Sequence, residues 1–364
     1  MQTISIALAD RAYDVVVGYE IAPEIGAMLR AVLPDDQLLV VTDTDVQQVC
    51  LAALVPGLQA AGYRFEVHAI PAGEAQKSFA NAAQLWDKLV GGGYTRNAGL
   101  LAVGGGVVSD LTGFVASTFM RGIRWAAVPT SMMSQLDASI GGKTAINLPQ
   151  AKNVIGSFYQ PRRVLTDTAF LRTLPKRELS SGLAEAVKYG LLIGDDFLKF
   201  MESNATRIFA MESGPLTETL LRCIRFKAGL IAMDERDEKE RMVLNLGHTL
   251  GHSLEKLGNY EQFRHGEAVA IGLVFATRLA VQRGVCQAKE LAQRTESLLN
   301  VFQLPTRLPE YPAEAVLDTM RRDKKVCRND QIRFIFPITA GQMTMQDIPC
   351  AEVLRAIQEF GRRP

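Results

Sequence analysis

The sequence is poor in the residues on which several classes of protein depend. Its 364 residues include only five cysteines, two tryptophans and four histidines. The cysteines are scattered and form no Cys-x-x-Cys pair, which argues against a disulfide framework and a thiolate zinc site and fits a reducing compartment. Since 40 Lys and Arg residues oppose 39 Asp and Glu residues, the basic excess typical of nucleic-acid-binding proteins is missing.

Long hydrophobic runs are missing as well. Asp10 and Arg11 interrupt the N-terminal region before the apolar core of a signal peptide could form. The longest uncharged apolar stretch, residues 97–109, is shorter than the roughly 20 residues that a membrane-spanning helix needs. The content of 48% hydrophobic and 22% charged residues is typical of globular proteins. We therefore expect a soluble, cytoplasmic protein with a sizeable core.

The first half of the chain alternates strand-like and helix-like segments. The segment 78–90 is typical of a helix that begins after Ser78 and ends at the glycines 91–93. Strands that alternate with helices predict a parallel, Rossmann-like sheet with ligands at the carboxyl ends of its strands. The strand-like segments are residues 4–8, 37–43, 63–70, 98–103 and 125–131.

The pattern changes near residue 175. From about residue 180 to 300 the apolar residues recur at helical spacing, and only the segment 332–337 is typical of a later strand. We therefore expect an α/β domain over residues 1–175 and a mainly α-helical domain over residues 176–364.

Two glycine-rich turns resemble phosphate-binding motifs. Gly104-Gly105-Gly106 follows a predicted strand and precedes a predicted helix, whose N-terminus would attract a phosphate. Ser109 stands where the dinucleotide fingerprint has another glycine, so a tight turn without a ligand stays open as an alternative. Before Lys143, Gly141-Gly142 resembles the end of a P-loop, but the upstream glycine of that motif is missing, which disfavours it.

Three of the four histidines lie close together in the sequence, at His248, His252 and His265. The first two are four residues apart, which places both imidazoles on one helix face at a spacing that suits a divalent metal. The alternative is that these polar side chains only line a pair of helices. A metal bound by imidazoles usually also takes a carboxylate or a water; Glu185, in an apolar helix-like segment, and Glu267 are the candidates, and spacing leaves both open.

Several basic residues lie beside glycines or inside apolar segments. Singly each is typical of a solvated face, but as a set they indicate an anionic ligand, because phosphates and carboxylates need charged donors to replace water. These residues are Arg121, Lys143, Lys152, Lys188, Lys227 and Arg241.

Taken together, these motifs resemble the 3-dehydroquinate synthases, which are sugar-phosphate cyclases, over nearly the whole chain. The resemblance implies an NAD-binding domain, a helical metal-binding domain, an active site in the cleft between them, and a homodimer. The segments that carry it are PAGEAQKS (71–78), GGGVVSDLTGFVASTFMRGI (104–123), PTSMMSQLDASIGGKTAIN (129–147), KNVIGSFYQP (152–161), ELSSGLAEAVKYG (178–190), NLGHTLGHSLE (245–255) and RHGEAVAIG (264–272).

The resemblance also implies a reaction. Members of the family convert 3-deoxy-D-arabino-heptulosonate 7-phosphate to 3-dehydroquinate and phosphate in the shikimate pathway, using NAD and zinc or cobalt. Transient oxidation is followed by phosphate elimination, re-reduction, ring opening and aldol closure, so the enzyme is a carbon–oxygen lyase. Two rivals are a metal-dependent alcohol or glycerol dehydrogenase, which would release NADH, and a non-catalytic regulator that binds NAD and metal.

Site residues follow from the resemblance position by position. The metal ligands would be Glu185, His248 and His265, which favours Glu185 over Glu267 and moves His252 to the substrate phosphate region. Positions matching NAD contacts are Asp43, Glu74, Lys77, Gly106, Val107, Val108, Ser109, Asp110, Thr130, Ser131, Phe170, Leu171, Arg172 and Thr173, and Lys143 and Lys152 border both cofactor and substrate. Positions matching substrate contacts are Asp137, Asn153, Lys188, Lys227, Arg241, Asn245, Lys325 (favoured over Lys324) and, from the partner subunit of the dimer, Arg121.

The sequence departs from the family pattern at three positions, which lie in two of these segments. Ser109 replaces a glycine in the phosphate turn, Ser131 replaces a threonine, and Ala145 stands where glycine is common. Because a serine hydroxyl at position 109 would crowd the cofactor, we expect altered NAD affinity rather than lost activity.

Overall fold

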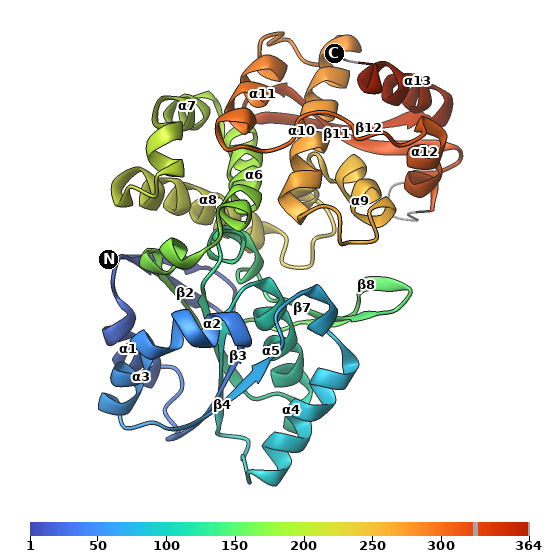
Figure 1. Cartoon of the computed structure of the whole chain (residues 1–364). Coiled ribbons are helices and arrows are strands. Elements are labelled where there is room, and N and C mark those ends of the chain that lie inside the picture. Colours follow the sequence, from blue (N-terminus) through green and yellow to red (C-terminus); the bar gives the residue numbers. More distant parts are fainter. Residues whose placement is uncertain (323–326, 363–364) are drawn as a thin grey trace. The chain divides into compact units, whose positions relative to one another are not determined.

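The computed structural model in Figure 1 describes residues 1–322 and 327–362. The chain forms two compact units, of which the first comprises Met1–Pro175 with Leu220–Glu238 and the second comprises Lys176–Thr219 with Lys239–Pro364. One boundary falls at Pro175, where the sequence pattern changes. Leu220–Glu238, which the sequence pattern grouped with the second half, belongs to the first unit, so the division falls inside helix α8 (Ser213–Met233).

The first unit is built on a seven-stranded sheet. Strand β1 runs antiparallel to β2, and every other pair of neighbours is parallel, which confirms the predicted parallel α/β fold. From β3 onward the chain adds β4 on one side and β5, β6 and β9 on the other, so β3 and β5 flank a topological switch point, the usual place for a ligand. In spatial order the strands are β1 (Gln2–Ile6), β2 (Tyr13–Gly18), β9 (Arg163–Asp167), β6 (Arg124–Pro129), β5 (Gly99–Gly104), β3 (Gln37–Asp43) and β4 (Arg64–Ile70).

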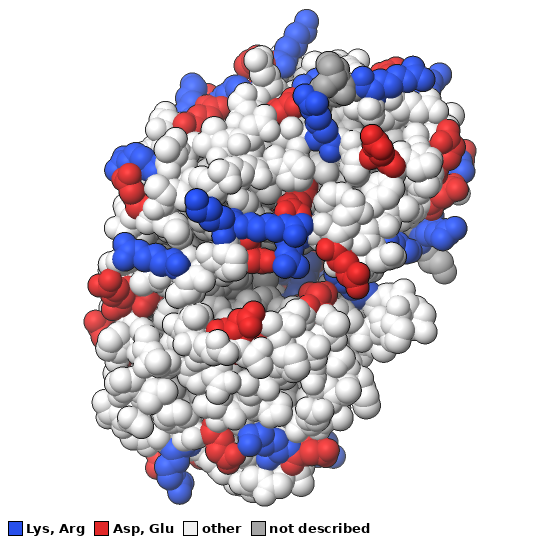
Figure 2. Space-filling view, viewed as in Figure 1, with Lys and Arg blue, Asp and Glu red and all other residues white. Residues whose placement is uncertain are grey.

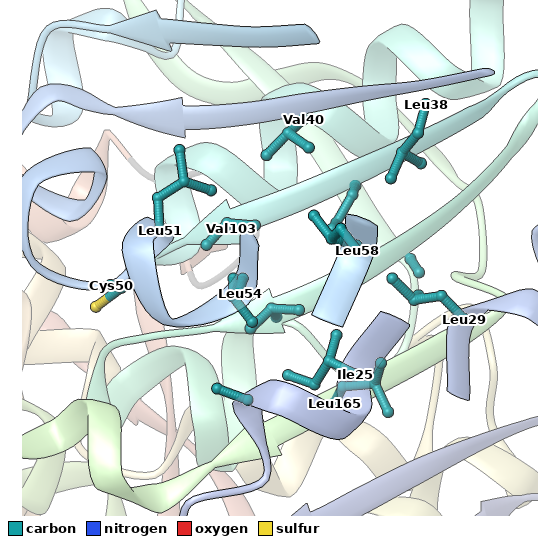
Figure 3. Close-up of a cluster of buried hydrophobic side chains, with 14 of the residues drawn as sticks. Ile25, Leu29, Leu38, Val40, Cys50, Leu51, Leu54, Leu58, Val103 and Leu165 are labelled. Carbon is teal, nitrogen blue, oxygen red and sulfur yellow. The ribbon is translucent and has the colours of Figure 1, made fainter. Parts of the chain in front are cut away.

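Apolar side chains from two helices cover one face of this sheet, as Figure 3 shows. In α3 (Leu51–Ala60), Leu54 and Leu58 recur at helical spacing and are fully buried against strand residues such as Val40 and Val103. Burial of each such side chain stabilises the fold by about 1.5–3 kcal/mol. The same cluster includes buried side chains of α1 (Ile25–Arg30). Its packing fixes the positions of the strands whose carboxyl ends are described below.

The first unit also contains three further helices, a hairpin and the part of α8 from Leu220 onward. Helix α4 (Phe79–Gly91) begins where predicted, because the Ser78 hydroxyl accepts a hydrogen bond from the backbone N–H of Asn81 at 3.3 Å. The glycine pair before Lys143 leads into a strand and not a helix, which rules out a P-loop. The other elements are α2 (Thr44–Val49), α5 (Gly106–Thr118), and the antiparallel strands β7 (Lys143–Leu148) and β8 (Ala151–Phe158).

The second unit is mainly helical, as predicted. The predicted late strand lies within β11 (Gln331–Thr339), which pairs with β10 (Cys327–Arg328) and β12 (Gln342–Pro349). The sequence did not indicate β12 because most of its residues are exposed or half-buried without a clear alternation. The helices are α6 (Lys176–Ile193), α7 (Asp195–Phe209), α9 (His248–Leu257), α10 (His265–Gln282), α11 (Leu291–Val301), α12 (Ala313–Arg321) and α13 (Cys350–Gly361), together with the first residues of α8.

Glycines let three helices of the second unit approach each other closely. A Cβ atom on Gly266 of α10 would lie 1.8 Å from the carbonyl oxygen of Ser181 in α6. A Cβ atom on Gly272 would lie 1.9 Å from the carbonyl oxygen of Gly247, the residue before α9. Only glycine fits at these contacts, which bring the starts of α9 and α10 to the middle of α6.

The surface in Figure 2 carries acidic and basic side chains interspersed with uncharged ones. Among the described helices, none is both long and apolar enough to cross a membrane.

Candidate functional site

The second unit brings together a carboxylate and two imidazoles. Glu185 lies in the middle of α6, whereas His248 and His265 are the first residues of α9 and α10. The Nε2 atoms of both histidines lie 3.5 Å from Glu185 Oε1, and the possible ligand atoms of the three groups lie within 4.8 Å of one another. Two imidazoles and one carboxylate are a common ligand set for a catalytic divalent metal.

The Glu185 carboxylate is buried and surrounded by positive or protonatable groups. Neither of its oxygens has a hydrogen-bond partner of good geometry among the described residues, although Lys188 Nζ is ion-paired with it. Burial opposes its ionisation, but Lys188 and the two imidazoles outweigh burial and hold the pKa of Glu185 well below its usual range. A buried anion with spare acceptor capacity fits a bound cation.

The two imidazoles differ in their surroundings. Burial lowers the pKa of His248 to about 3, so this ring is neutral and can offer a lone pair. Burial acts the same way on His265, but the Glu185 and Glu255 carboxylates raise the pKa of His265 to about 10. The Nδ1 atom of His248 lies 3.1 Å from the Leu246 carbonyl oxygen, which leaves its Nε2 atom toward Glu185.

Glu267, the alternative carboxylate, has a different role. Its oxygens accept hydrogen bonds from the Arg177 guanidinium at 2.6 and 2.8 Å, and one also accepts from the backbone N–H of Arg264 at 2.9 Å. These bonds cap the first turn of α10. Glu267 is therefore outside the group of Glu185, His248 and His265.

His252 lies beside the group but is exposed. Its ring centroid lies 5.2 Å from that of His248, and it shares a second possible ligand group with Glu255 and His265. Sequence reasoning missed Glu255, which is 7% exposed and lies 3.2 Å from His265 Nδ1. The sequence did carry a signal for Glu255, because a residue seven positions after His248 lies on the same face of helix α9.

The other predicted residues of the second unit are cationic or amide side chains. Lys188 and Arg241 are each only 1% exposed. Asn245 is exposed, and its side-chain amide donates a hydrogen bond to the Met242 carbonyl oxygen at 3.2 Å. Lys324 and Lys325 lie outside the described residues.

The predicted NAD positions of the first unit gather at the carboxyl edge of the parallel sheet. Asp43 ends β3 and caps α2, where it accepts hydrogen bonds from the N–H groups of Asp45 and Val46 at 3.0 and 2.9 Å. Burial raises its pKa, and these bonds oppose the shift. Gly106 follows the end of β5, Thr130 and Ser131 follow β6, and Glu74 and Lys77 follow β4.

Helix α5 begins at the glycine turn, so its first N–H groups lack partners within the helix and suit a phosphate. The Ser109 hydroxyl donates to the carbonyl oxygens of Gly105 and Gly106, at 3.2 and 3.3 Å. Ser109 is only 4% exposed, and both of these bonds lie within the first turn of the helix. The effect of Ser109 on NAD affinity stays a prediction.

At further predicted NAD positions the side chains are buried or bonded to neighbouring residues. The side chains of Val108, Phe170 and Leu171 are buried in the apolar interior. Arg172 stacks its guanidinium over the Tyr19 ring at 5.1 Å, and the Thr173 hydroxyl donates to the Phe170 carbonyl oxygen at 2.7 Å. Val107 lies in the first turn of α5.

A network of charged side chains adjoins the glycine turn. Lys77 is 4% exposed and donates to Asp110 at 2.6 Å. Burial raises the pKa of Asp110, and Lys77 opposes this shift. Glu74 lies 3.9 Å from Lys152 Nζ, and the side chain of Asn147 connects Glu74 to the Asn153 N–H, with distances of 2.7 and 3.0 Å.

Two more predicted substrate cations pair with carboxylates of the same unit. Lys227, 4% exposed, donates to the Asp137 carbonyl oxygen at 2.6 Å and is ion-paired with its carboxylate. Asp137 lies in a π-helical turn, Ser134–Ala138, a feature common at functional sites. Lys143 is ion-paired with Asp237. Because Lys227 and Asp237 lie in Leu220–Glu238, these pairs help to explain why that segment belongs to the first unit.

Comparisons with known proteins bear on both units. Residues 67–181 match the sequence model described as 3-dehydroquinate synthase N-terminal, and residues 182–326 match the one described as C-terminal. The 3-dehydroquinate synthase of Geobacter metallireducens is 42% identical over 335 residues, which cover 92% of each chain. That of Desulforamulus reducens is 37% identical over 361 residues, 99% of this chain and 100% of that protein.

The solved structure of a 2-epi-5-epi-valiolone synthase from Streptomyces hygroscopicus, with NAD+ and Zn2+ bound, is also similar. It has a TM-score of 0.88 and 26% sequence identity, over 98% of this chain and 99% of that one. The fold of the two units and the near-complete alignments to curated relatives agree, and the chain belongs to the 3-dehydroquinate synthase family.

Proposed function

We propose that this protein converts 3-deoxy-D-arabino-heptulosonate 7-phosphate to 3-dehydroquinate and phosphate, as a lyase that depends on NAD and a divalent metal. The observation that carries the proposal is the buried Glu185 carboxylate, which faces two imidazole Nε2 atoms at 3.5 Å in a member of this family. Besides its ion pair with Lys188, this buried carboxylate lies with two imidazoles in a ligand set that suits a catalytic divalent metal.

The ligands in this proposal are Glu185, His248 and His265, and the metal is zinc or cobalt. When bound, the metal would act as a Lewis acid toward a substrate hydroxyl, and NAD would accept the hydride and later return it. Lys188 keeps Glu185 ionised, and the Leu246 carbonyl oxygen holds the ring of His248 in place.

NAD binding is assigned to the carboxyl edge of the sheet. The N–H groups at the start of α5 would receive the pyrophosphate, with the glycine turn allowing its close approach. The residues assigned are Asp43, Glu74, Lys77, Gly106 to Asp110, Thr130, Ser131, Phe170 to Thr173, Lys143 and Lys152. Support comes from the strand order, because sheets of this kind bind dinucleotides at the topological switch point.

Substrate binding is assigned to the cations, which would hold the phosphate and carboxylate groups of the sugar acid. Lys188, Lys227 and Arg241 are almost fully buried, and ammonium and guanidinium groups are suited to hold phosphates and carboxylates. Since the departing phosphate can itself take the proton, the main tasks of the protein are positioning and charge neutralisation. The set is completed by Lys143, Lys152, Asn153, Asp137, Asn245, His252 and Lys325.

We also assign a homodimer in which Arg121 reaches the neighbouring active site. Arg121 is exposed and its φ is 63°, a left-handed conformation that a non-glycine residue adopts at a cost. On β8, Val154 and Ile155 are 56% and 43% exposed, and such apolar side chains favour an interface.

Subunit mixing tests the dimer. Inactive Arg121→Ala protein and inactive Glu185→Gln protein, unfolded and refolded together, should recover about a quarter of wild-type activity, because half of the dimers then hold one intact site. No recovery, with dimers shown by light scattering, would contradict a shared site.

One experiment separates the proposed function from its rivals. The protein is supplied with NAD, zinc and the heptulosonate phosphate, and phosphate release and NADH absorbance are followed together. Phosphate without net NADH is expected of the synthase. NADH that accumulates without phosphate would indicate the dehydrogenase, and binding of NAD and metal without turnover would indicate the regulator.

A further inference from the structure

We propose that Glu255 is a positioning residue that fixes the ring of His265 for metal binding. The inference rests on the proposed function, since it concerns the metal held by Glu185, His248 and His265. It adds a residue for which neither the sequence motifs nor the family resemblance gave a role.

The geometry assigns the two nitrogens of His265 to different partners. Nδ1 lies 3.2 Å from Glu255 Oε2, whereas Nε2 lies 3.5 Å from Glu185 Oε1. If Nδ1 carries the proton and donates it to Glu255, the lone pair of Nε2 is directed to the Glu185 side of the ring. A carboxylate behind an imidazole fixes its tautomer and orientation and makes it a stronger ligand.

The contrast with His248 explains why His265 needs a charged partner. The side chain of His248 is 11% exposed, and a neutral carbonyl oxygen from Leu246 is enough to hold its Nδ1 atom. The side chain of His265 is 35% exposed, so water can compete for its ring nitrogens. A hydrogen bond to an ionised carboxylate is about twice as strong as one to a neutral acceptor and withstands that competition better.

The same atoms define an alternative in which Glu255 is itself a ligand. Its carboxylate, with His252 and His265, forms a second group close enough to hold an ion. The two arrangements exclude each other, because an Nδ1 atom that donates a proton to Glu255 has no lone pair for a metal. The geometry favours donation, since 3.2 Å is a hydrogen-bonding distance.

The test measures metal affinity on purified protein by competition with a chromophoric chelator. Glu255→Gln keeps an oxygen that can accept from Nδ1 but removes the charge, and Glu255→Ala removes both. We expect the zinc dissociation constant to rise by about 10–100-fold in Glu255→Gln, and further in Glu255→Ala. The visible absorption bands of the cobalt-substituted protein should shift as well, which a merely structural role would not cause.

Glu267→Gln is the matched control. It removes a partly buried carboxylate two residues from His265 and breaks the pair with Arg177, but it does not touch the imidazole. It should lower the melting temperature while the zinc dissociation constant stays within about twofold of wild type. Equal loss of zinc affinity in Glu267→Gln and Glu255→Gln would mean that loosening of α10 is the cause, and would overturn the proposal.

Two other results would also overturn it. Wild-type zinc affinity and an unchanged cobalt spectrum in Glu255→Gln would show that the carboxylate does not position the ring. Two cobalt ions per wild-type chain and one per Glu255→Gln chain would show that Glu255 is a ligand. Failure of the proposed metal site is distinguishable, because Glu185→Gln would then bind zinc as tightly as wild type.

Discussion

The two units arrange their candidate residues in opposite ways. In the second unit, three ligand atoms from three helices lie within 4.8 Å, around a carboxylate with no exposed surface. In the first unit, the candidates are distributed over turns that follow β3, β4, β5 and β6, and several are already ion-paired with neighbours.

This difference indicates how each site should respond to change. The helical group depends on backbone contacts between helices, such as that of Gly266 with Ser181, so small changes there alter every ligand distance. The turns at the sheet edge can each move without the others. A lysine there can also leave its carboxylate partner and pair with a phosphate of the ligand instead. Substitutions in the second unit should therefore have the larger effects.

The largest effect is expected for Glu185→Gln. Loss of the carboxylate removes a ligand and leaves Lys188 without its buried partner, so kcat should fall by more than about 10³-fold. Metal content is measured by atomic emission and folding by circular dichroism, with Glu267→Gln as the control. A variant with full zinc content and full rate would refute the ligand assignment.

Gly266→Ala tests whether helix contact controls the group. The added Cβ atom would meet a backbone oxygen at 1.8 Å, so we expect a loss of about 1–3 kcal/mol in unfolding free energy together with weaker zinc binding. Gly229→Ala, in an exposed part of α8 with no atom within 4 Å, should instead stabilise by about 0.4–1 kcal/mol. Urea denaturation measures both, and equal stability of the two variants would contradict the contact's importance.

Lys152→Ala tests the sheet edge. Because phosphate binding aligns the elimination, KM should rise and kcat should fall together, with kcat/KM lowered by at least about tenfold. Lys88→Ala breaks a surface ion pair with Glu66 at 2.8 Å and should leave both constants unchanged. Steady-state assays of phosphate release measure these constants, and wild-type kinetics in Lys152→Ala would remove that lysine from the site.

The smallest effect is expected for Ser109→Gly. Its hydroxyl bonds within the first turn of α5, so its loss should change the NAD dissociation constant by less than about tenfold and leave zinc binding unchanged. Helix stability should fall by up to about 1 kcal/mol, as it should in Ser117→Gly near the end of the same helix. Fluorescence titration with NADH measures the cofactor affinity, and complete loss of binding would show that the serine contacts the cofactor.

Much of the fold was predictable because its signals are local. The continuous apolar run 37–43 is β3, and Ser78 caps α4 where the sequence indicated. Strands β2 and β9 were not predicted; nearly all of their residues are buried, so they lack the alternation that marks a half-buried strand. Glu185 and Glu267 could not be separated by spacing, and only the contacts of Glu267 with Arg177 and Arg264 gave that side chain its own role.

By itself the sequence determined the alternation that produces a parallel sheet, the glycine turn at its edge, and the family to which the motifs belong. These depend on the periodicity of apolar residues and on short motifs, which adjacent residues specify. Only the tertiary structure decided that Leu220–Glu238 belongs to the first unit and that Glu255 faces His265. Both depend on which helix faces meet, and that is set by packing between residues far apart in the chain.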